Sequence, residues 1–433
     1  MKLSSLLSVV GAVGLAALGC AGSPASSSLG SGGAQGSGSG GSTGTGSGGR
    51  SAGTGGAAMP MPVTKDPSTY TQTAGAKFLY PQNHRFANCP AFPAYDTDVV
   101  MHAYTAWKTK FYSGGRVIRP DNGNDTVSEG IAYGMLASVY FNDQTVFDTL
   151  WGYAQSHMDG NGVMNWHWTS SGSMASDGQG GATDADEDMA WALLMAGAQW
   201  GNSKSYTQQG TTLIGNIWNH EVDHGGGEVL KPGDMFGGAS QTNPSYFAPA
   251  YYRVFGAVTN NATGWNNVIA KSYQIIASSG GSHGLVPDWS DSGGGRQKDG
   301  LYHYDACRTP WRIALDYCMN GDTNAKAYLD KINAFFSPKR LDQIFDSYTV
   351  DGTQAGTSCN GAPCIGGMSF VGPLGVSAMS STTYAPFAQT IYTSLAGGTN
   401  QAYVNSASFS YFHASWAALS LLTLSGNFFD YTQ

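Results

Sequence analysis

The sequence has few charged residues. Asp, Glu, Lys and Arg make up only 12% of its 433 residues, and the formal net charge is −8. Proteins that bind nucleic acid use clustered Lys and Arg side chains to neutralise phosphates, and no basic cluster stands out here. We therefore expect no nucleic acid partner. Hydrophobic residues make up 41% of the chain, which is enough for a sizeable folded core.

The apolar stretch at the N-terminus is shorter than a membrane-spanning helix requires. It runs from Leu3 to Leu18, follows a single Lys and precedes Cys20, whereas a spanning helix needs about 20 apolar residues. This pattern is typical of an export signal, and the ending Ala-Leu-Gly-Cys is similar to the cleavage site of bacterial lipoproteins. We predict a lipoprotein-type signal peptide over residues 1–20, a possible lipid anchor on Cys20, and a cell-surface or extracellular location. Ordinary secretion without a lipid is the alternative.

The segment after Cys20 lacks the apolar residues needed to fold. Residues 21–58 are almost entirely Gly, Ser, Ala and Thr, and Arg50 is their only charge. We predict a disordered linker here. The composition does not shift again from Met59 onward, so residues 59–433 are expected to form one domain.

Cysteine is scarce, and no Cys-x-x-Cys spacing indicates zinc. Export would permit disulfides. Cys359 and Cys364 flank Asn-Gly-Ala-Pro, a turn-forming insert, and are the pair that we predict. The sequence does not assign Cys89, Cys307 and Cys318.

Strand-like alternation is also scarce, whereas apolar residues recur at helical spacing in many segments. Gly-rich connections between these segments carry many of the polar and aromatic residues. The pattern predicts an all-α domain, packed as a toroid or solenoid, with a site built from loops at one end. The predicted helices cover residues 99–111, 129–140, 145–155, 185–200, 206–218, 265–277, 310–318, 325–336, 384–395 and 411–424.

Against this sparse charge, four carboxylates stand within five positions: Asp184, Asp186, Glu187 and Asp188. They open a predicted helix, where the helix dipole favours each acid by about 0.3–1 kcal/mol, and Thr183 or Asp184 is a suitable N-cap. Capping explains two or three acids but not four. We therefore expect Asp186, Glu187 and Asp188 to cap the helix and face solvent, while Asp184 faces a cleft.

Two further acids lie where loops enter helices. Glu129 follows Ser128 at the start of an apolar helix, and Asp305 precedes Pro310, which suits a first helical turn. Arg308 would hold Asp305 ionised. Either acid alone could be structural, as a helix-start acid or a loop ion pair. Together, one protonated and one ionised carboxyl are the equipment of a glycosidase.

Five stretches stand out in order along the chain: SEGIAYGM (128–135), ATDADEDMAWALLMAGAQW (182–200), NPSYFAP (243–249), GLVPDW (284–289) and YDACRTPWR (304–312). Together they resemble glycoside hydrolase family 8, and the resemblance covers residues 84–424. It implies an (α/α)6 barrel with long loops that form an active-site groove at one end. It also implies inverting hydrolysis of β-1,4-linked glycans without a metal or cofactor.

Matched residue by residue, the resemblance makes Glu129 the general acid, Asp305 the base and Asp184 the acid that binds sugar at the cleavage site. Tyr246 and Arg308 match positions that orient the water and the base. Inversion implies acid and base carboxyls about 6.5–9.5 Å apart. We further expect Asp184 to keep Glu129 protonated through like-charge repulsion, helped by apolar burial.

A polysaccharide site needs flat aromatic platforms, because sugar rings present apolar C–H faces. Trp166 and Trp168 lie in a loop beside Asn and Gly, which favours binding over core packing. The other candidates are Phe236, Tyr246, Trp289 and Tyr411.

One competing pattern is His-Glu-Val-Asp-His at residues 220–224, which matches the zinc-protease motif. Three glycines follow directly and would end the helix at the second His, so we disfavour this reading. A non-catalytic surface glycan-binding protein is the alternative from another class, although both acids argue against it.

The expected activity is that of a monomeric, cellulase-type endo-β-1,4-glucanase, with polysaccharide as its partner. Cellulose-type or mixed-linkage β-glucan is the first choice of substrate, since the sequence Ala-Thr-Asp-Ala-Asp-Glu-Asp resembles that of the glucanase members of the family. Xylan is the main alternative and chitosan the third. A chitosanase needs extra acids along its groove, for which Glu228, Asp234 and Asp299 are candidates.

Overall fold

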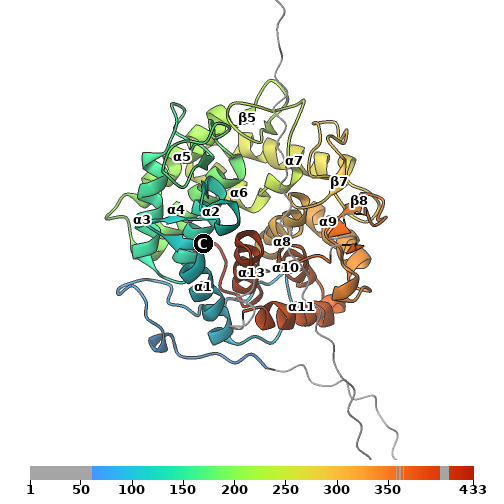
Figure 1. The fold of residues 1–433 in the computed structure, drawn as a ribbon, viewed down its shortest axis with the longest axis horizontal. Coiled ribbons are helices and arrows are strands. Elements are labelled where there is room, and N and C mark those ends of the chain that lie inside the picture. The colour runs from blue at the N-terminus through green and yellow to red at the C-terminus, as the bar shows by residue number, and fades with distance from the viewer. Residues whose placement is uncertain (1–60, 357, 360–361, 364, 400–408) are drawn as a thin grey trace, which may run out of the picture.

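The computed structural model describes residues 61–399 and 409–433, apart from 357, 360, 361 and 364. This part of the chain is mostly helical (Figure 1). The signal peptide and linker predicted over residues 1–58 lie outside the described residues, and so does the predicted pairing of Cys359 with Cys364.

The described α-helices alternate along the chain between an inner and an outer ring (Figure 1). Six inner and six outer helices confirm the predicted (α/α)6 barrel. The inner helices are α2 (Ser128–Tyr140), α4 (Thr183–Trp200), α6 (Pro249–Val258), α8 (Thr309–Asn320), α10 (Met368–Ala378) and α13 (Tyr411–Leu424). The outer helices are α1 (Thr97–Phe111), α3 (Gln144–Ser156), α5 (Tyr206–His220), α7 (Ala262–Ser279), α9 (Thr323–Phe336) and α11 (Ala385–Gly397).

Burial follows from the two rings. An outer helix needs only one apolar face, and α5 buries residues at helical spacing, including Tyr206, Gly210, Leu213 and Ile217. Inner helices are surrounded by neighbours, and every residue of α10 is buried. The core is therefore a helical ring enclosed by a second ring.

The predicted helices are all present, but α6 and α10 were missed. α6 begins at Pro249, and α10 contains Pro373, so both segments contain residues that are typical of loops. In α10 a side chain on Gly372 or Gly375 would stand 2.5 Å from Ser420 or 2.6 Å from Ile391. Close packing against the neighbouring helices therefore overrides the weak local preference.

The described strands are short antiparallel pairs in the connections. One of them leads straight into α2 and ties the loop that contains Trp166 and Trp168 to the start of that helix. The pairs are β1 (Tyr112–Ser113) with β2 (Arg116–Val117), β3 (Thr126–Val127) with β4 (His167–Trp168), β5 (Val222–Asp223) with β6 (Val229–Leu230), β7 (Leu301–Tyr302) with β8 (Tyr348–Thr349), and β9 (Ser358–Cys359) with β10 (Ala362–Pro363). The 3-10 helices are η1 (Pro67–Thr69), η2 (Pro120–Asn122), η3 (Pro244–Tyr246), η4 (Ala306–Arg308), η5 (Leu341–Gln343) and η6 (Thr382–Tyr384).

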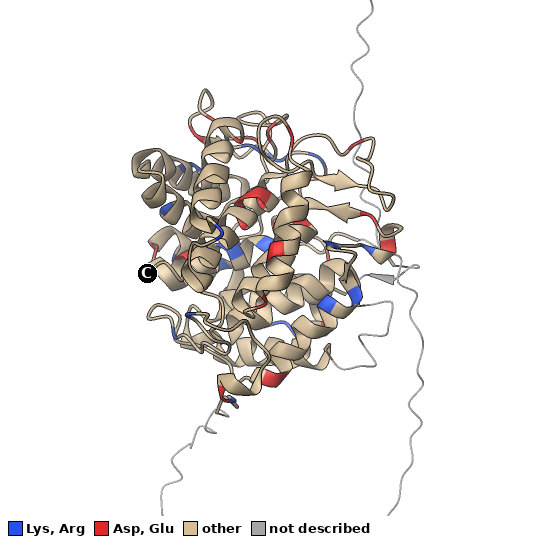
Figure 2. Cartoon of the chain, turned by 90° about the vertical axis from the view of Figure 1, so that its left-hand side faces the viewer, with Lys and Arg blue, Asp and Glu red and all other residues tan. Residues whose placement is uncertain are grey.

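A disulfide joins Cys89, ahead of α1, to Cys318 in α8, and Cys307 is a buried free thiol. On the face shown in Figure 2, charged residues are few and both signs are interspersed. None of the helices in the described part of the chain combines the length and the apolar character that crossing a membrane requires.

Candidate active site

The guanidinium of Arg308 lies among three carboxylates that stand at the starts of α2 and α4 and in the turn just before η4 and α8. Its Nη1 donates to Glu129 Oε2 at 2.9 Å and to Asp184 Oδ2 at 2.6 Å. Its Nη2 donates to Asp305 Oδ1 at 2.8 Å. Because inner helices of the barrel run in the same direction, α2, α4 and α8 bring these residues to one end of the ring. The three acids that the sequence singled out therefore meet at one cation.

The contacts with Arg308 limit the distance between Glu129 and Asp305. They fall on different nitrogens of one planar guanidinium, so Glu129 Oε2 and Asp305 Oδ1 are at most about 8 Å apart. Arg308 and Asp184 are buried, whereas the side chains of Glu129 and Asp305 are 22% and 33% exposed. Glu129 and Asp305 are therefore the most accessible of the three acids, whereas Asp184, which we expected to face a cleft, has a side chain that is only 4% exposed.

Glu129 has a raised pKa, as a group that must hold a proton requires. Burial is the main cause, and the charge of Asp184 adds to it, while Arg308 and the hydroxyl of Tyr411 oppose the rise. Tyr411 Oη donates to Glu129 Oε1 at 3.0 Å. The expected direction is correct, but we had expected the charge of Asp184 to be the leading cause. Burial is the larger effect because Glu129 enters a ring of packed helices.

Asp305 is held through both of its oxygens. Arg308 binds Oδ1, and Trp289 Nε1 donates to Oδ2 at 3.1 Å. Arg308 also lies 5.2 Å from the ring centre of Tyr246 and donates a hydrogen bond to Ser245 Oγ at 2.9 Å. The structure thus places Arg308 on the carboxylate that the sequence proposed as the base, and Tyr246 against Arg308.

The expectation that three of the four α4 acids face solvent is wrong, because Asp186, Glu187 and Asp188 are all buried. The helix is preceded by Ala182 and has no side-chain cap. An inner helix has no solvent face, so each acid takes a partner from another element. Asp188 accepts from Arg312 Nη2 at 2.9 Å, Glu187 from Tyr252 Oη at 2.9 Å, and Asp186 from the backbone N–H of Met164 at 3.0 Å.

Asp186 and Glu221 form a buried pair of carboxyl groups. Asp186 Oδ2 and Glu221 Oε1 each lie 2.8 Å from the point where a side chain on Gly181 would begin. Neither oxygen has a donor among the described residues. Burial raises the pKa of both groups, and the charge of Asp186 further raises the pKa of Glu221. The pair therefore needs a proton to be stable.

Replacing Glu221 by Gln is expected to stabilise the protein increasingly as the pH rises. The pKa of Glu221 lies above its unfolded value of about 4.3, so the folded state binds more protons and loses stability as the pH rises above that value. Gln removes this titration. Thermal melting of wild type and Glu221→Gln from about pH 4 to pH 8 should show a widening difference. Asp186→Asn should act in the same direction, and a difference independent of pH would contradict the raised pKa of Glu221.

The aromatic candidates lie in different settings. Trp166 and Trp168 are partly buried next to α2, because Ser128 N–H donates to the backbone carbonyl of Trp166 at 2.8 Å. Phe236 is 46% exposed and offers an open ring. Tyr411 is buried and bonded to Glu129. Sugar binding by these residues, and by Tyr246 under Arg308, stays a prediction.

The zinc-protease pattern does not form a two-His helical face. α5 ends at His220, Glu221 is buried, and the chain continues into β5 before His224. The described residues contain no group of three or more His, Cys, Asp or Glu arranged to hold a metal ion.

Several contacts of the site are not predictable from the sequence. Ser245 binds Arg308, and Trp289 binds Asp305 instead of offering an open ring. Asp288 accepts backbone N–H groups on both sides of Asp305. Ser245 lies in the stretch NPSYFAP, and Asp288 and Trp289 lie in GLVPDW. These two motifs indicated that the residues belong to the site, but their contacts cannot be derived from the sequence.

A helical double ring with two accessible carboxyls beside one buried arginine fits a glycoside hydrolase, which needs a pair of acids at one site. The chain belongs to glycosyl hydrolases family 8, whose family model matches residues 87–423. Endoglucanase A of Acetivibrio thermocellus is 42% identical over 77% of this chain and 70% of its own length. The beta-glucanase of Niallia circulans is 33% identical over 81% of this chain and 91% of its own.

Solved structures have the same fold. The apo beta-1,3-1,4-glucanase from Paenibacillus sp. X4 aligns with a TM-score of 0.71 and 32% identity, covering 81% of this chain and 98% of its own. A family 8 xylobiose complex from Teredinibacter turnerae aligns with a TM-score of 0.65 and 20% identity over 78% of this chain and 95% of its own. At that identity the second likeness concerns the fold alone.

Proposed function

We propose that the protein is an exported, monomeric endo-β-1,4-glucanase that acts on cellulose-type or mixed-linkage β-glucan with inversion. The observation that carries the chemistry is one arginine holding two reachable carboxyls, with Glu129 on one nitrogen and Asp305 on the other. The raised pKa of Glu129 supports its role as the acid. The names of two relatives that are 42% and 33% identical, an endoglucanase and a beta-glucanase, support the choice of glucan.

In the proposed reaction, Glu129 protonates the glycosidic oxygen as the bond to the anomeric carbon breaks. Asp305 takes a proton from a water that attacks the same carbon from the opposite face of the ring. Asp305 thereby gains the proton and Glu129 loses one, and exchange with solvent restores both. Asp184 binds sugar hydroxyls at the cleavage site while it is held by Arg308.

The acids considered for a chitosanase do not form a row of free carboxylates. Asp234 is buried and accepts from Gly181 N–H at 2.7 Å, and Glu228 lies 3.5 Å from His224. Asp299 is exposed. This arrangement supports a neutral glucan over a cationic one.

A substrate panel tests the proposal. Reducing ends released from carboxymethylcellulose, lichenan, xylan and chitosan should be highest for a β-glucan, and Glu129→Gln should lower the release by about 10²- to 10⁴-fold. Highest release from xylan or chitosan would reject the substrate. An equal, zero release by wild type and variant on every substrate would indicate a binding protein without activity.

The proposal of export rests on residues 1–20 and on the small residues that precede Cys20. In a bacterial host, labelled fatty acid should be incorporated into the wild type but not into Cys20→Ala. Release of an unlabelled wild-type protein into the medium would favour ordinary secretion.

A further inference from the structure

Trp289 contacts the carboxylate of Asp305 edge-on. Its Nε1 donates to Oδ2 at 3.1 Å, while Arg308 donates to Oδ1 at 2.8 Å. An indole N–H is only ever a donor, so this contact requires an oxygen that is free to accept. With one donor on each oxygen, rotation of the carboxylate is restricted.

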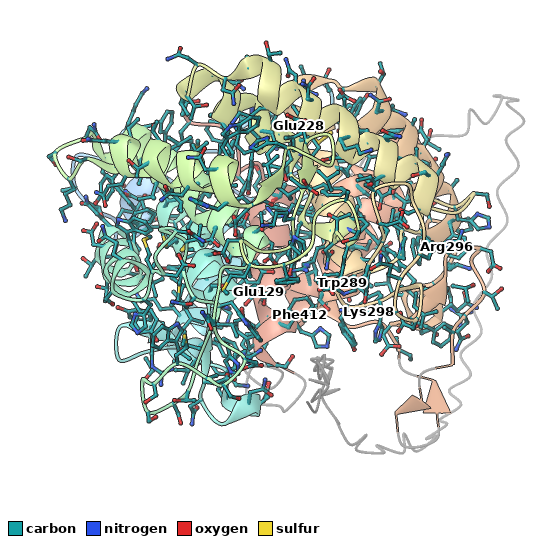
Figure 3. The ribbon with its side chains drawn as sticks, turned by 90° about the horizontal axis from the view of Figure 1, so that it is seen from above. Glu129, Glu228, Trp289, Arg296, Lys298 and Phe412 are labelled. Atoms are coloured by element: carbon teal, nitrogen blue, oxygen red, sulfur yellow. A yellow bond between two sulfur atoms is a disulfide. The ribbon has the colours of Figure 1, made fainter. Side chains whose placement is uncertain are left out.

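The indole ring is itself held in place. Trp289 is 8% exposed, and Lys298 Nζ lies 3.5 Å from the centre of its ring (Figure 3). The backbone carbonyl of Trp289 also accepts from Gln297 N–H at 2.9 Å. A covered ring of this kind suits a fixed hydrogen-bond donor better than a sugar platform.

Asp288, the preceding residue, holds the backbone of the loop that contains Asp305. Its Oδ1 accepts from the N–H of His303 at 3.1 Å and from the N–H of Ala306 at 2.7 Å. Its own N–H donates to the carbonyl of Leu301 at 2.8 Å. Burial and the nearby charge of Asp305 raise the pKa of Asp288 well above its usual value, so a neutral side chain suits this position.

We propose that Trp289 is a positioning residue for the catalytic base, and that Asp288 positions the same base through the loop backbone. The inference rests on the proposed role of Asp305. Trp289 thus holds the carboxylate of Asp305 directly, through Oδ2, and Asp288 holds the backbone of the loop on either side of Asp305. A base displaced by about 1 Å can cost 10²-fold in rate.

The first test compares Trp289→Phe with Trp265→Phe. Trp265 is a buried tryptophan of α7 whose Nε1 has no acceptor among the described residues, so its variant reports lost packing alone. Trp289→Phe should lower kcat on lichenan by about 10- to 100-fold, because it removes a hydrogen bond to a charged group. Its KM should stay within about twofold of the wild-type value. Trp265→Phe should keep kcat within about twofold whatever its melting temperature.

A substrate with a good leaving group separates the base from the acid. On β-cellotriosyl fluoride, whose fluoride needs little protonation, the defect of Glu129→Gln should largely disappear and that of Trp289→Phe should remain. Recovery of Trp289→Phe activity on the fluoride would overturn the proposal. So would a kcat of Trp289→Phe on lichenan within about threefold of wild type, or a rise in KM with kcat unchanged.

A second pair of variants serves if Trp289→Phe does not fold. Asp288→Asn keeps an oxygen for both backbone N–H groups and should keep kcat within about threefold, whereas Asp288→Ala should lower it by at least about tenfold. Equal kcat in these two variants would overturn the role of Asp288. Asp305→Asn, measured alongside, distinguishes the failures: its full activity would reject the role of Asp305 as the base, on which this inference rests, and would leave the glucanase activity itself in place.

Discussion

Asp305→Asn is expected to lower kcat on β-glucan by about 10⁴-fold, the upper end of what a general base contributes. Asn has the size of Asp and keeps an oxygen for a donor, but it cannot take a proton from water. The side chain is one-third exposed, and the Asn oxygen can still accept from Arg308, although its NH2 cannot accept from Trp289. We therefore expect the fold of the site to be retained. Steady-state release of reducing ends measures the loss.

Binding separates a lost base from a collapsed site. Calorimetric titration of Asp305→Asn with cellotetraose should give a Kd close to that of an inactive Glu129→Gln control, because neither change removes a sugar contact that the proposal requires. Retained turnover would mean that another group serves as the base. Loss of both binding and folding would mean that Asp305 is structural.

Arg308→Gln is expected to destabilise the protein by about 3–5 kcal/mol and to remove most of the activity. Breaking a buried ion pair leaves uncompensated charge, and here three carboxylates lose a common partner whose side chain is 2% exposed. Arg308 lowers the pKa of Glu129, so its loss should raise that pKa further. Urea unfolding and kcat report the two effects.

Two controls bracket this prediction. Arg308→Lys keeps the charge but loses the planar fork, so it should restore part of the stability and little of the rate. Arg340→Gln breaks the exposed pair with Asp342 and should leave the unfolding midpoint unchanged. An Arg308→Gln variant as stable as wild type would show that the carboxylates find other partners.

The sequence predicted the helices whose apolar spacing is regular, and failed where packing overrides local preference. α10 contains Pro373 and two glycines that neighbouring side chains approach closely, and no periodicity signals such contacts. The pairing of Cys89 with Cys318 spans 229 residues and depends on where the barrel closes. Spacing along the chain does not contain that information.

The candidate site was predictable to the extent that its residues stand in motifs. Glu129, Asp184, Asp305 and Arg308 were singled out, and the structure brings them together. The burial of Asp186 was not predictable, because a helix dipole explains an acid at a helix start equally well on the surface and in an inner ring.

The central claim is that Glu129 and Asp305 act on opposite faces of one glycosidic bond, with water on the side of Asp305. Proton NMR of a fresh digest of a cello-oligosaccharide tests it most directly, because the first anomer formed reports the face from which water attacked. Inversion at a β-linkage predicts that the α-anomer appears first and then mutarotates. An initial β-anomer would contradict it.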